Sequence, residues 1–342
     1  MEHHHFHWLE KLQVQIMTIV GLLAVYFLAW PAVRPDDPLA PMTFLPLGGY
    51  GSAAGFAIVF CLLVAVCAAA TVAVRPVGGL LSATLAAGAV SLRSPQIRAL
   101  LWARQGDVGN LYAQLMAEAL MLAVLATVAS LIVFVVRRTA AAINPNWLWK
   151  NPMTEPADPQ REEASDSPAA KVETSSPDAD ATLWARIRSA VHAAGQQASR
   201  VAGRREGARL MVGRCAACVL VAAIIATVML VAVMQSSDRG QIIFALLVSF
   251  TVGLFVAHQI FPQPHALVAW VLPMIIAVGF YAMAWAGVRP DGPGDWARVN
   301  VLFRALPVDW LTAGGGGALL GFWISQRVHE YRHVHHGHEH GE

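Results

Sequence analysis

The sequence predicts an all-α integral membrane protein with about eight transmembrane helices. Apolar residues make up 56% of the 342-residue chain and charged residues only 13%, and the mean hydropathy is +0.51. Because soluble domains carry roughly 25% charged residues, the excess of apolar surface has to be buried in lipid. Apolar runs of transmembrane length recur along the chain, and one stretch of sequence occurs twice.

Eight apolar runs approach the length of a membrane span. A helix needs about 20 residues to cross the hydrocarbon core of a bilayer, and the runs lie at 14–33, 50–74, 76–92, 114–136, 215–234, 241–258, 266–287 and 311–326. The first is longer than a secretory signal segment and lacks a small-x-small cleavage site, so we expect it to remain as a span. The third and the last are short, and each is expected either to span or to form a re-entrant or interfacial segment.

The stretch that occurs twice ends an apolar run and opens a polar loop in each copy. Residues 26–38 read YFLAWPAVRPDDP, and residues 281–293 read YAMAWAGVRPDGP. A Leu-Pro step and a glycine-rich segment follow in both copies before the next apolar run. Self-similarity of this kind indicates a partial internal duplication. With eight spans both loops emerge on the same face, so the duplication is expected to be parallel.

The charged residues are concentrated between the two membrane halves, which are residues 1–138 and 215–327. Pro, Ser and acidic residues predict a disordered linker over 139–181. An Arg-rich stretch with an apolar stripe predicts a basic amphipathic juxtamembrane helix over 182–214. Anionic lipid headgroups are its expected partners, with a regulatory protein as the alternative.

The basic residues also predict the orientation. Arg137-Arg138 and the Arg-rich stretch flank the two spans next to the central segment, which places both termini and residues 137–214 in the cytoplasm. The short loops alone favour the opposite orientation. A composition rich in Ala and Arg is typical of a bacterial protein and hence of the inner membrane. The net charge of +2 gives no reason to expect a nucleic-acid partner, whereas other membrane proteins or a second copy of the chain are possible partners.

The repeated loops supply the first candidate binding residues: Arg34, Asp36, Arg289 and Asp291. In each loop a Pro between Arg and Asp ends the helix and can turn the acid back toward the Arg. Two such corners would form a polar pair at the outer mouth. The alternative is that they are span-ending turns whose Arg binds lipid phosphate. The glycines that follow permit close backbone approach, either for helix packing or for a ligand.

Glu118 is the candidate intramembrane acid. It lies near the start of the fourth run, four residues after Gln114. Because a carboxylate in lipid is costly, such a residue suggests ion or proton handling. Its depth depends on where the helix begins: a start at Leu111 places Glu118 about two turns inside, whereas a start near Leu115 leaves it at the interface.

Histidines gather at both ends of the chain, on the same predicted face. His3, His4, His5 and His7 lie near the beginning, and the tail, residues 328–342, contains the candidate metal ligands His329, His333, His335, His336, His338 and His340. Imidazole binds zinc, nickel and cobalt without a preformed pocket. Loose divalent-metal binding and a structural or adventitious role are both consistent with this composition. His258 is explained more simply by helix capping or interfacial solvation.

Two short motifs occur close to the ends of spans. His329-Glu330-Tyr331-Arg332-His333 matches H-E-x-x-H, which on a helix places two His on one face for zinc. In a segment rich in His and Glu this match has little specificity, and a protease also needs a third ligand and a shaped cleft. Cys215 and Cys218 form C-x-x-C, but all four cysteines lie in apolar runs, so buried packing is expected, not a disulfide or redox pair.

Three functions are consistent with these features. A transporter or permease, or an integral subunit of a membrane complex, is favoured by the duplication, the outer corners and Glu118. A non-catalytic scaffold or signalling protein that recruits partners through its central loop is favoured by the long polar insert. A membrane zinc metalloprotease rests on H-E-x-x-H alone.

Overall fold

The computed structural model describes residues 2–35, 41–44, 60–61, 64–65, 67, 76–104, 107–143, 213–262, 266–287 and 299–339. Within these ranges no strand is present, which confirms the predicted all-helical class. Met1–Trp149 and Ala217–Glu342 form one compact unit. Its elements are α1 (Glu2–Ala24), α2 (Trp30–Val33), α4 (Pro76–Arg93), α5 (Arg98–Ala103), α6 (Val108–Ile143), a helix at Gly213–Val233, α9 (Arg239–Ile260), α10 (Leu267–Gly287), α12 (Pro307–Asp309) and α13 (Gly315–Glu339).

Four of the described helices are long and apolar enough to cross a membrane: Val108–Ala140, Gly213–Val233, Arg239–Ile260 and Ala269–Gly287. Two shorter apolar helices, Leu12–Leu28 and Val77–Arg93, correspond to the predicted runs 14–33 and 76–92. α6 begins before its predicted run and continues beyond it, so Arg137 and Arg138 lie inside the helix. The run 50–74, the linker and the basic stretch lie mostly outside the described residues.

The long helices expose apolar side chains on one side and bury the other. On α6 the exposed side carries Leu120, Val124, Leu131 and Phe134, whereas Leu115, Ala119, Leu122 and Ala126 are buried. The helix at Gly213–Val233 likewise exposes Leu220, Ile224 and Val228. Apolar stripes of this length on a helical surface are suited to contact with lipid chains, so the chain is a helical membrane protein.

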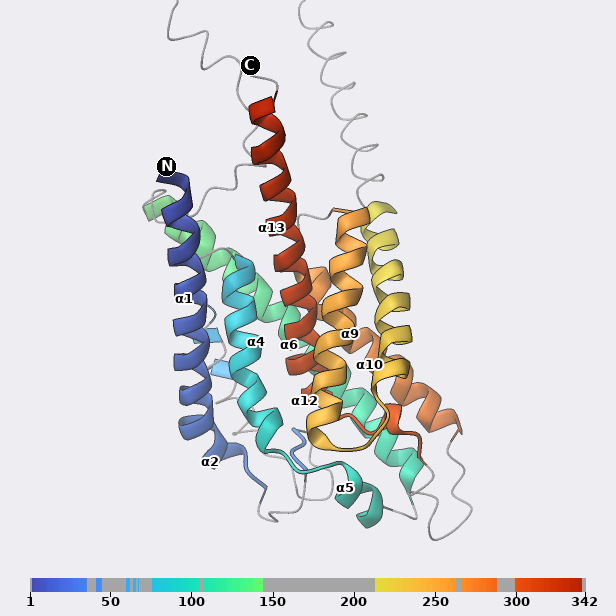
Figure 1. Cartoon of the computed structure of the whole chain (residues 1–342). Coiled ribbons are helices and arrows are strands. Elements are labelled where there is room, and N and C mark those ends of the chain that lie inside the picture. Colours follow the sequence, from blue (N-terminus) through green and yellow to red (C-terminus); the bar gives the residue numbers. More distant parts are fainter. Residues whose placement is uncertain are drawn as a thin grey trace, which may run out of the picture. The chain divides into compact units, whose positions relative to one another are not determined.

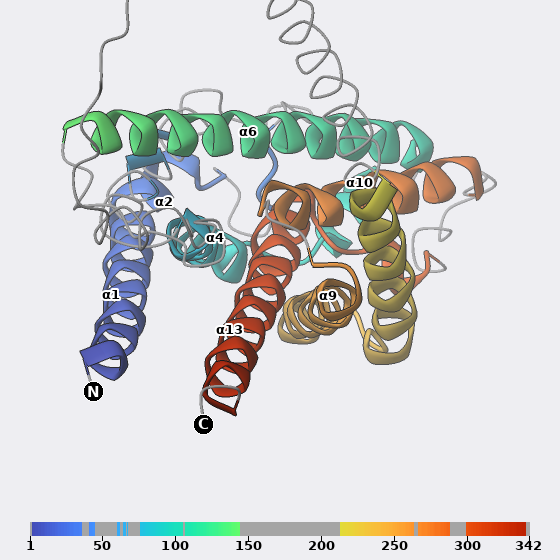
Figure 2. The same ribbon diagram turned by 90° about the horizontal axis from the view of Figure 1, so that it is seen from above.

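α13 lies at the centre of the packing. It contacts α9, α10 and α4; α1 packs on the other side of α4, and α10 packs against α6. Seen from above, α4 lies between α1 and α13, and α6 runs along one side of the group (Figure 2). The two weakest predicted runs, 76–92 and 311–326, therefore belong to the helices with the most protein neighbours, which explains their small residues.

Two glycines bring the backbone of α13 against α9. A Cβ added at Gly317 would lie 2.2 Å from the Leu247 carbonyl oxygen, and one added at Gly321 would lie 2.2 Å from the Thr251 carbonyl oxygen. Thr251 Oγ1 also donates a hydrogen bond of 3.1 Å to the Gly317 carbonyl. Small residues four apart let two helices approach this closely. Gly317 belongs to the glycine-rich segment that follows the second repeated loop, and of the two roles expected for that segment this position serves helix packing.

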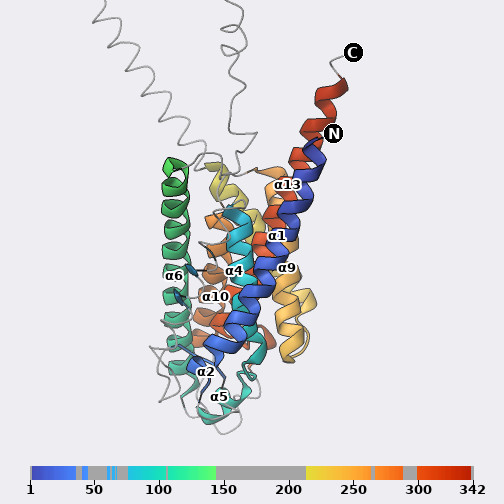
Figure 3. The same cartoon turned by 90° about the vertical axis from the view of Figure 1, so that its left-hand side faces the viewer.

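The two ends of the described chain lie at the same end of this unit (Figure 1). α1, which leads into the first repeated stretch, and α10, which contains the beginning of the second, both run toward the opposite end (Figures 1 and 3). The side chains of the two copies have different surroundings. Tyr26 is partly buried beneath the Arg93 guanidinium, which lies 4.0 Å from its ring centroid, whereas Tyr281 is completely buried. The internal duplication stays a prediction.

Candidate functional site

The centre of the candidate site is a buried ion pair between Asp309 and Arg239. Asp309 ends α12 and is completely buried, and Arg239 begins α9 with its side chain only 14% exposed. Arg239 Nη1 donates a hydrogen bond to Asp309 Oδ2, and Nη2 donates one to Oδ1, both 2.5 Å long. Two parallel charge-assisted hydrogen bonds fix orientation as well as distance, so this pair sets how the two helix ends meet.

The local sequence holds Asp309 in place. Leu306 is extended and Pro307 begins α12, where the fixed φ of proline suits the first turn of a helix. The Leu306 N–H donates a 2.8 Å hydrogen bond to Asp309 Oδ2, and the Asp309 N–H donates one of 2.9 Å to the Leu306 carbonyl. The Asp309 carboxylate therefore caps its own helix while it accepts both bonds from Arg239.

Ser91 joins α4 to this pair. Its Oγ donates a 2.5 Å hydrogen bond to Asp309 Oδ1. Its carbonyl oxygen accepts hydrogen bonds from Arg239 Nη2 at 2.6 Å and from Arg239 Nε at 3.1 Å. The three residues thus tie the ends of α4, α9 and α12 together through groups that are shielded from water.

Glu118 and Tyr281 extend the buried polar region toward α6 and α10. Glu118 lies ten residues after the start of α6 and is completely buried, which agrees with the earlier of the two helix starts considered above. Tyr281 is completely buried on α10, and its ring centroid lies 6.2 Å from that of Tyr112 on α6, six residues before Glu118. The Tyr281 hydroxyl donates a 2.7 Å hydrogen bond to the Ala305 carbonyl. We call Ser91, Glu118, Arg239, Tyr281 and Asp309 the polar cluster.

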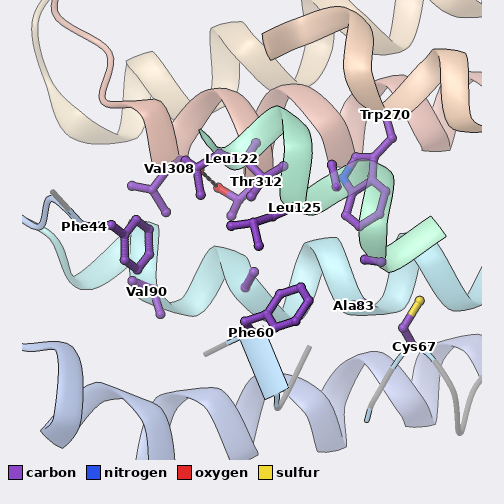
Figure 4. Close-up of a pocket in the computed structure, with 14 residues that line it drawn as sticks. Phe44, Phe60, Cys67, Ala83, Val90, Leu122, Leu125, Trp270, Val308 and Thr312 are labelled. Carbon is purple, nitrogen blue, oxygen red and sulfur yellow. Dashed lines mark hydrogen bonds between the residues drawn. The ribbon is translucent and has the colours of Figure 1, made fainter. Parts of the chain in front are cut away.

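An apolar pocket lies among α4, α6, α10 and α12 (Figure 4). On α6 it is lined by Leu122, Leu125, Ala126 and Ala129, which continue at helical spacing the face that begins at Glu118. Val308 and Thr312, on either side of Asp309 in the sequence, line it as well. Phe44 and Trp270 lie toward opposite ends of it in Figure 4. Such a pocket suits an apolar group.

The predicted outer-mouth pair cannot be assembled from the described residues. Arg34 is exposed just beyond α2, and its N–H donates a 2.9 Å hydrogen bond to the Trp30 carbonyl. Asp36, Arg289 and Asp291 lie outside the described ranges. The pairing of the two corners therefore stays a prediction.

The tail histidines are carried by a helix. α13 continues to Glu339, so H-E-x-x-H lies on helical backbone, and His329, His333, His335, His336 and His338 are all part of α13. The side chains after His329, and His340 as a whole, fall outside the described residues. In the described part of the chain no three His, Cys, Asp or Glu side chains come together to hold a metal ion. The cysteines Cys215 and Cys218 are thiols, the second of them buried.

Asp309, Arg239 and Ser91 were not predicted from the sequence as site residues. The available signal was the one that identified Glu118, an acid among apolar residues, because Asp309 occurs in the stretch LPVDWL. No protein-family model matches the chain, and comparisons with curated proteins and with solved structures also found no match.

Proposed function

We propose that the chain is an inner-membrane transporter of about eight spans in which Glu118 carries a coupling proton and the solute is an amphipathic cation. The observation that carries this proposal is the complete burial of Glu118 on a helix that is long and apolar enough to cross a membrane. An ionisable group held inside a span is costly and is typical of proton and ion pathways.

The rest of the cluster supports a binding site for a cation. Arg239 and Asp309 are paired with one another through two hydrogen bonds, and Glu118 is a second completely buried acid, on α6. A positively charged group would be attracted there, and the apolar pocket would accept the apolar body of the same molecule. Protonation of Glu118 would remove the attraction and release the solute.

The orientation is part of the proposal. The two ends of the described chain lie at one end of the unit, and the polar cluster lies toward the other end, at the close of α4 and the beginning of α9 (Figure 1). With the termini in the cytoplasm, as the Arg-rich segment favours, the polar cluster lies nearer the outer face. The duplicated halves and the contact of the basic stretch with anionic lipid belong to the same proposal.

The test is uptake of a fluorescent amphipathic cation into proteoliposomes with an acidic interior. We expect the purified protein to drive accumulation of the dye and to release internal protons at the same time. Glu118→Gln should reduce both fluxes at least tenfold. Asp107→Asn is the matched control, because Asp107 is an exposed carboxylate just before the same helix.

Size-exclusion profiles and melting temperatures in detergent separate loss of transport from loss of folding. Equal proton flux in the wild type and in Glu118→Gln would contradict the coupling role of Glu118. Wild-type protein that moves neither the dye nor protons would contradict the transport proposal itself.

A further inference from the structure

A buried tryptophan of α10 borders the apolar pocket with a polar atom that has no partner among the described residues. Trp270 is only 5% exposed and is one of the side chains that line the pocket. Its indole Nε1 is buried and forms no hydrogen bond with any described residue. In Figure 4 this nitrogen lies on the edge of the ring that is turned toward Leu125 and Thr312. Buried polar atoms without a partner are rare in native proteins, so this one calls for an explanation.

The beginning of α13 holds the Trp270 ring in place. A Cβ added at Gly315 would lie 2.7 Å from Trp270 Cδ1 and 3.0 Å from Nε1. The first distance is shorter than real Cβ contacts, so a larger residue at Gly315 would displace the ring. The indole therefore rests against the backbone of α13, and its N–H is kept at a fixed place on the border of the pocket.

The other side chains around the pocket offer little to a polar group. Of the described residues that line it, none is charged, and Thr312 is the other one with a strong hydrogen-bond donor. The Thr312 hydroxyl donates a 2.7 Å hydrogen bond to the Val308 carbonyl, so its hydrogen is already used. A molecule in this pocket therefore meets apolar surface and one available strong donor, the Trp270 N–H.

We propose that the Trp270 N–H donates a hydrogen bond to a carbonyl oxygen in the apolar part of the molecule that this pocket binds. In an apolar pocket a single well-placed polar group fixes the orientation of the ligand. A buried donor that otherwise stays unpaired favours a ligand with an acceptor over an analogue that lacks it. The inference rests on the proposed function, because the ligand is the amphipathic cation described above. It narrows that class to cations with an uncharged carbonyl group in their apolar part.

The experiment compares two cations that differ in one group. In benzoylbenzyl trimethylammonium a ketone joins the two aromatic rings, whereas in benzylbenzyl trimethylammonium a methylene group joins them. Calorimetry on the full-length protein in detergent micelles gives both dissociation constants, after subtraction of the heat measured in protein-free micelles. The wild-type protein should bind the ketone about tenfold more tightly, as expected for one buried hydrogen bond.

Two replacements of Trp270 test whether its N–H causes this preference. Trp270→Phe removes the N–H but also shortens the side chain. Replacement of Trp270 by benzothienylalanine puts sulfur in the place of the N–H and keeps a ring of the same shape. Both proteins should bind the two cations with equal affinity. Trp285→Phe is the matched control, because Trp285 lies on the same helix but is exposed, and it should keep the preference.

Melting temperatures measured in parallel identify the variants that are folded. Equal affinity of the wild-type protein for the two cations would overturn the inference, as would a preference that persists in the folded benzothienylalanine protein. Loss of the preference in Trp285→Phe would also overturn it, because the effect would then not belong to the pocket. Binding at equilibrium is separate from transport. A wild-type protein that prefers the ketone but moves neither dye nor protons would contradict the transport proposal and leave the hydrogen bond in place.

Discussion

Arg239 and Asp309, 70 residues apart in the sequence, meet through two parallel hydrogen bonds of 2.5 Å. One residue begins α9 and the other ends α12, and Ser91 of α4 bonds to both. A buried pair of this kind is strongly destabilising to break by removing one partner, whereas replacing both partners with apolar residues can be neutral. The polar cluster therefore makes a prediction about stability that does not depend on transport.

Asp309→Asn should lower the free energy of unfolding by about 3–5 kcal/mol, because it leaves the Arg239 charge without its carboxylate. The measurement is the unfolding midpoint of the purified protein in detergent micelles. Asp238→Asn is the matched control, since Asp238 precedes Arg239 in the chain but is exposed; its effect should stay within about 0.5 kcal/mol.

The double variant Arg239→Met with Asp309→Leu completes the test. It should recover most of the stability that Asp309→Asn loses, because no buried charge is left uncompensated. A double variant no more stable than Asp309→Asn would contradict this prediction. The hydrogen bonds of the pair would then stabilise the helix ends in a way that apolar side chains cannot replace.

Gly317→Ala should destabilise the protein by about 1–3 kcal/mol, the usual cost of overpacking a tight contact. The added methyl group would lie 2.2 Å from a backbone oxygen of α9, which cannot move as a side chain can. Gly88→Ala is the control, because nothing lies within 4 Å of a Cβ at that position in α4. Alanine favours the helix by up to about 1 kcal/mol over glycine, so the control should be neutral or stabilising. Equal melting temperatures for the two variants would contradict the close contact of α13 with α9.

Reporters fused to the two termini should give the same compartment. Since both ends of the described chain lie at one end of the helical unit (Figure 1), the number of membrane crossings between them is even. An enzyme that is active only in the cytoplasm, fused in turn to each terminus, should be active in both fusions. Activity at one terminus only would exclude eight spans, and activity at neither would reverse the proposed orientation.

The long helices could be predicted because lipid imposes both length and composition on them. α6 and α9 follow from uninterrupted apolar runs, and Glu118 stands out as an acid within such a run. α4 and α13 were ambiguous for a physical reason. Their Gly, Ala and Ser residues fit against other helices, and hydropathy does not distinguish a protein neighbour from a lipid neighbour.

The remaining site residues could not be predicted, because their roles depend on contacts between distant parts of the chain. Arg239 precedes an apolar run as many span-flanking charges do, and Asp309 follows a Leu-Pro step that resembles an ordinary loop. Trp270 resembles the other aromatic residues of the apolar runs, and nothing in the sequence indicates that its indole borders a pocket. Ser91 carries no sequence signal at all, because its function in the cluster comes from one hydroxyl and one carbonyl at the end of α4.

The helical stretch that contains Asp309 and continues into α13 changes its number of residues per turn along its length. Between Asp309 and Gly315 the backbone forms a π-helical segment, Trp310–Gly314, with a wider turn than the α-helix on either side of it. A turn of this kind accommodates one additional residue, and each residue of an α-helix rotates the side-chain direction by about 100°. Two unrelated demands are met in this way, since Asp309 faces Arg239 while Gly317 faces the backbone of α9. Deleting a single residue from this segment would therefore rotate either Asp309 away from Arg239 or Gly317 away from α9, although no other residue of the protein would be changed.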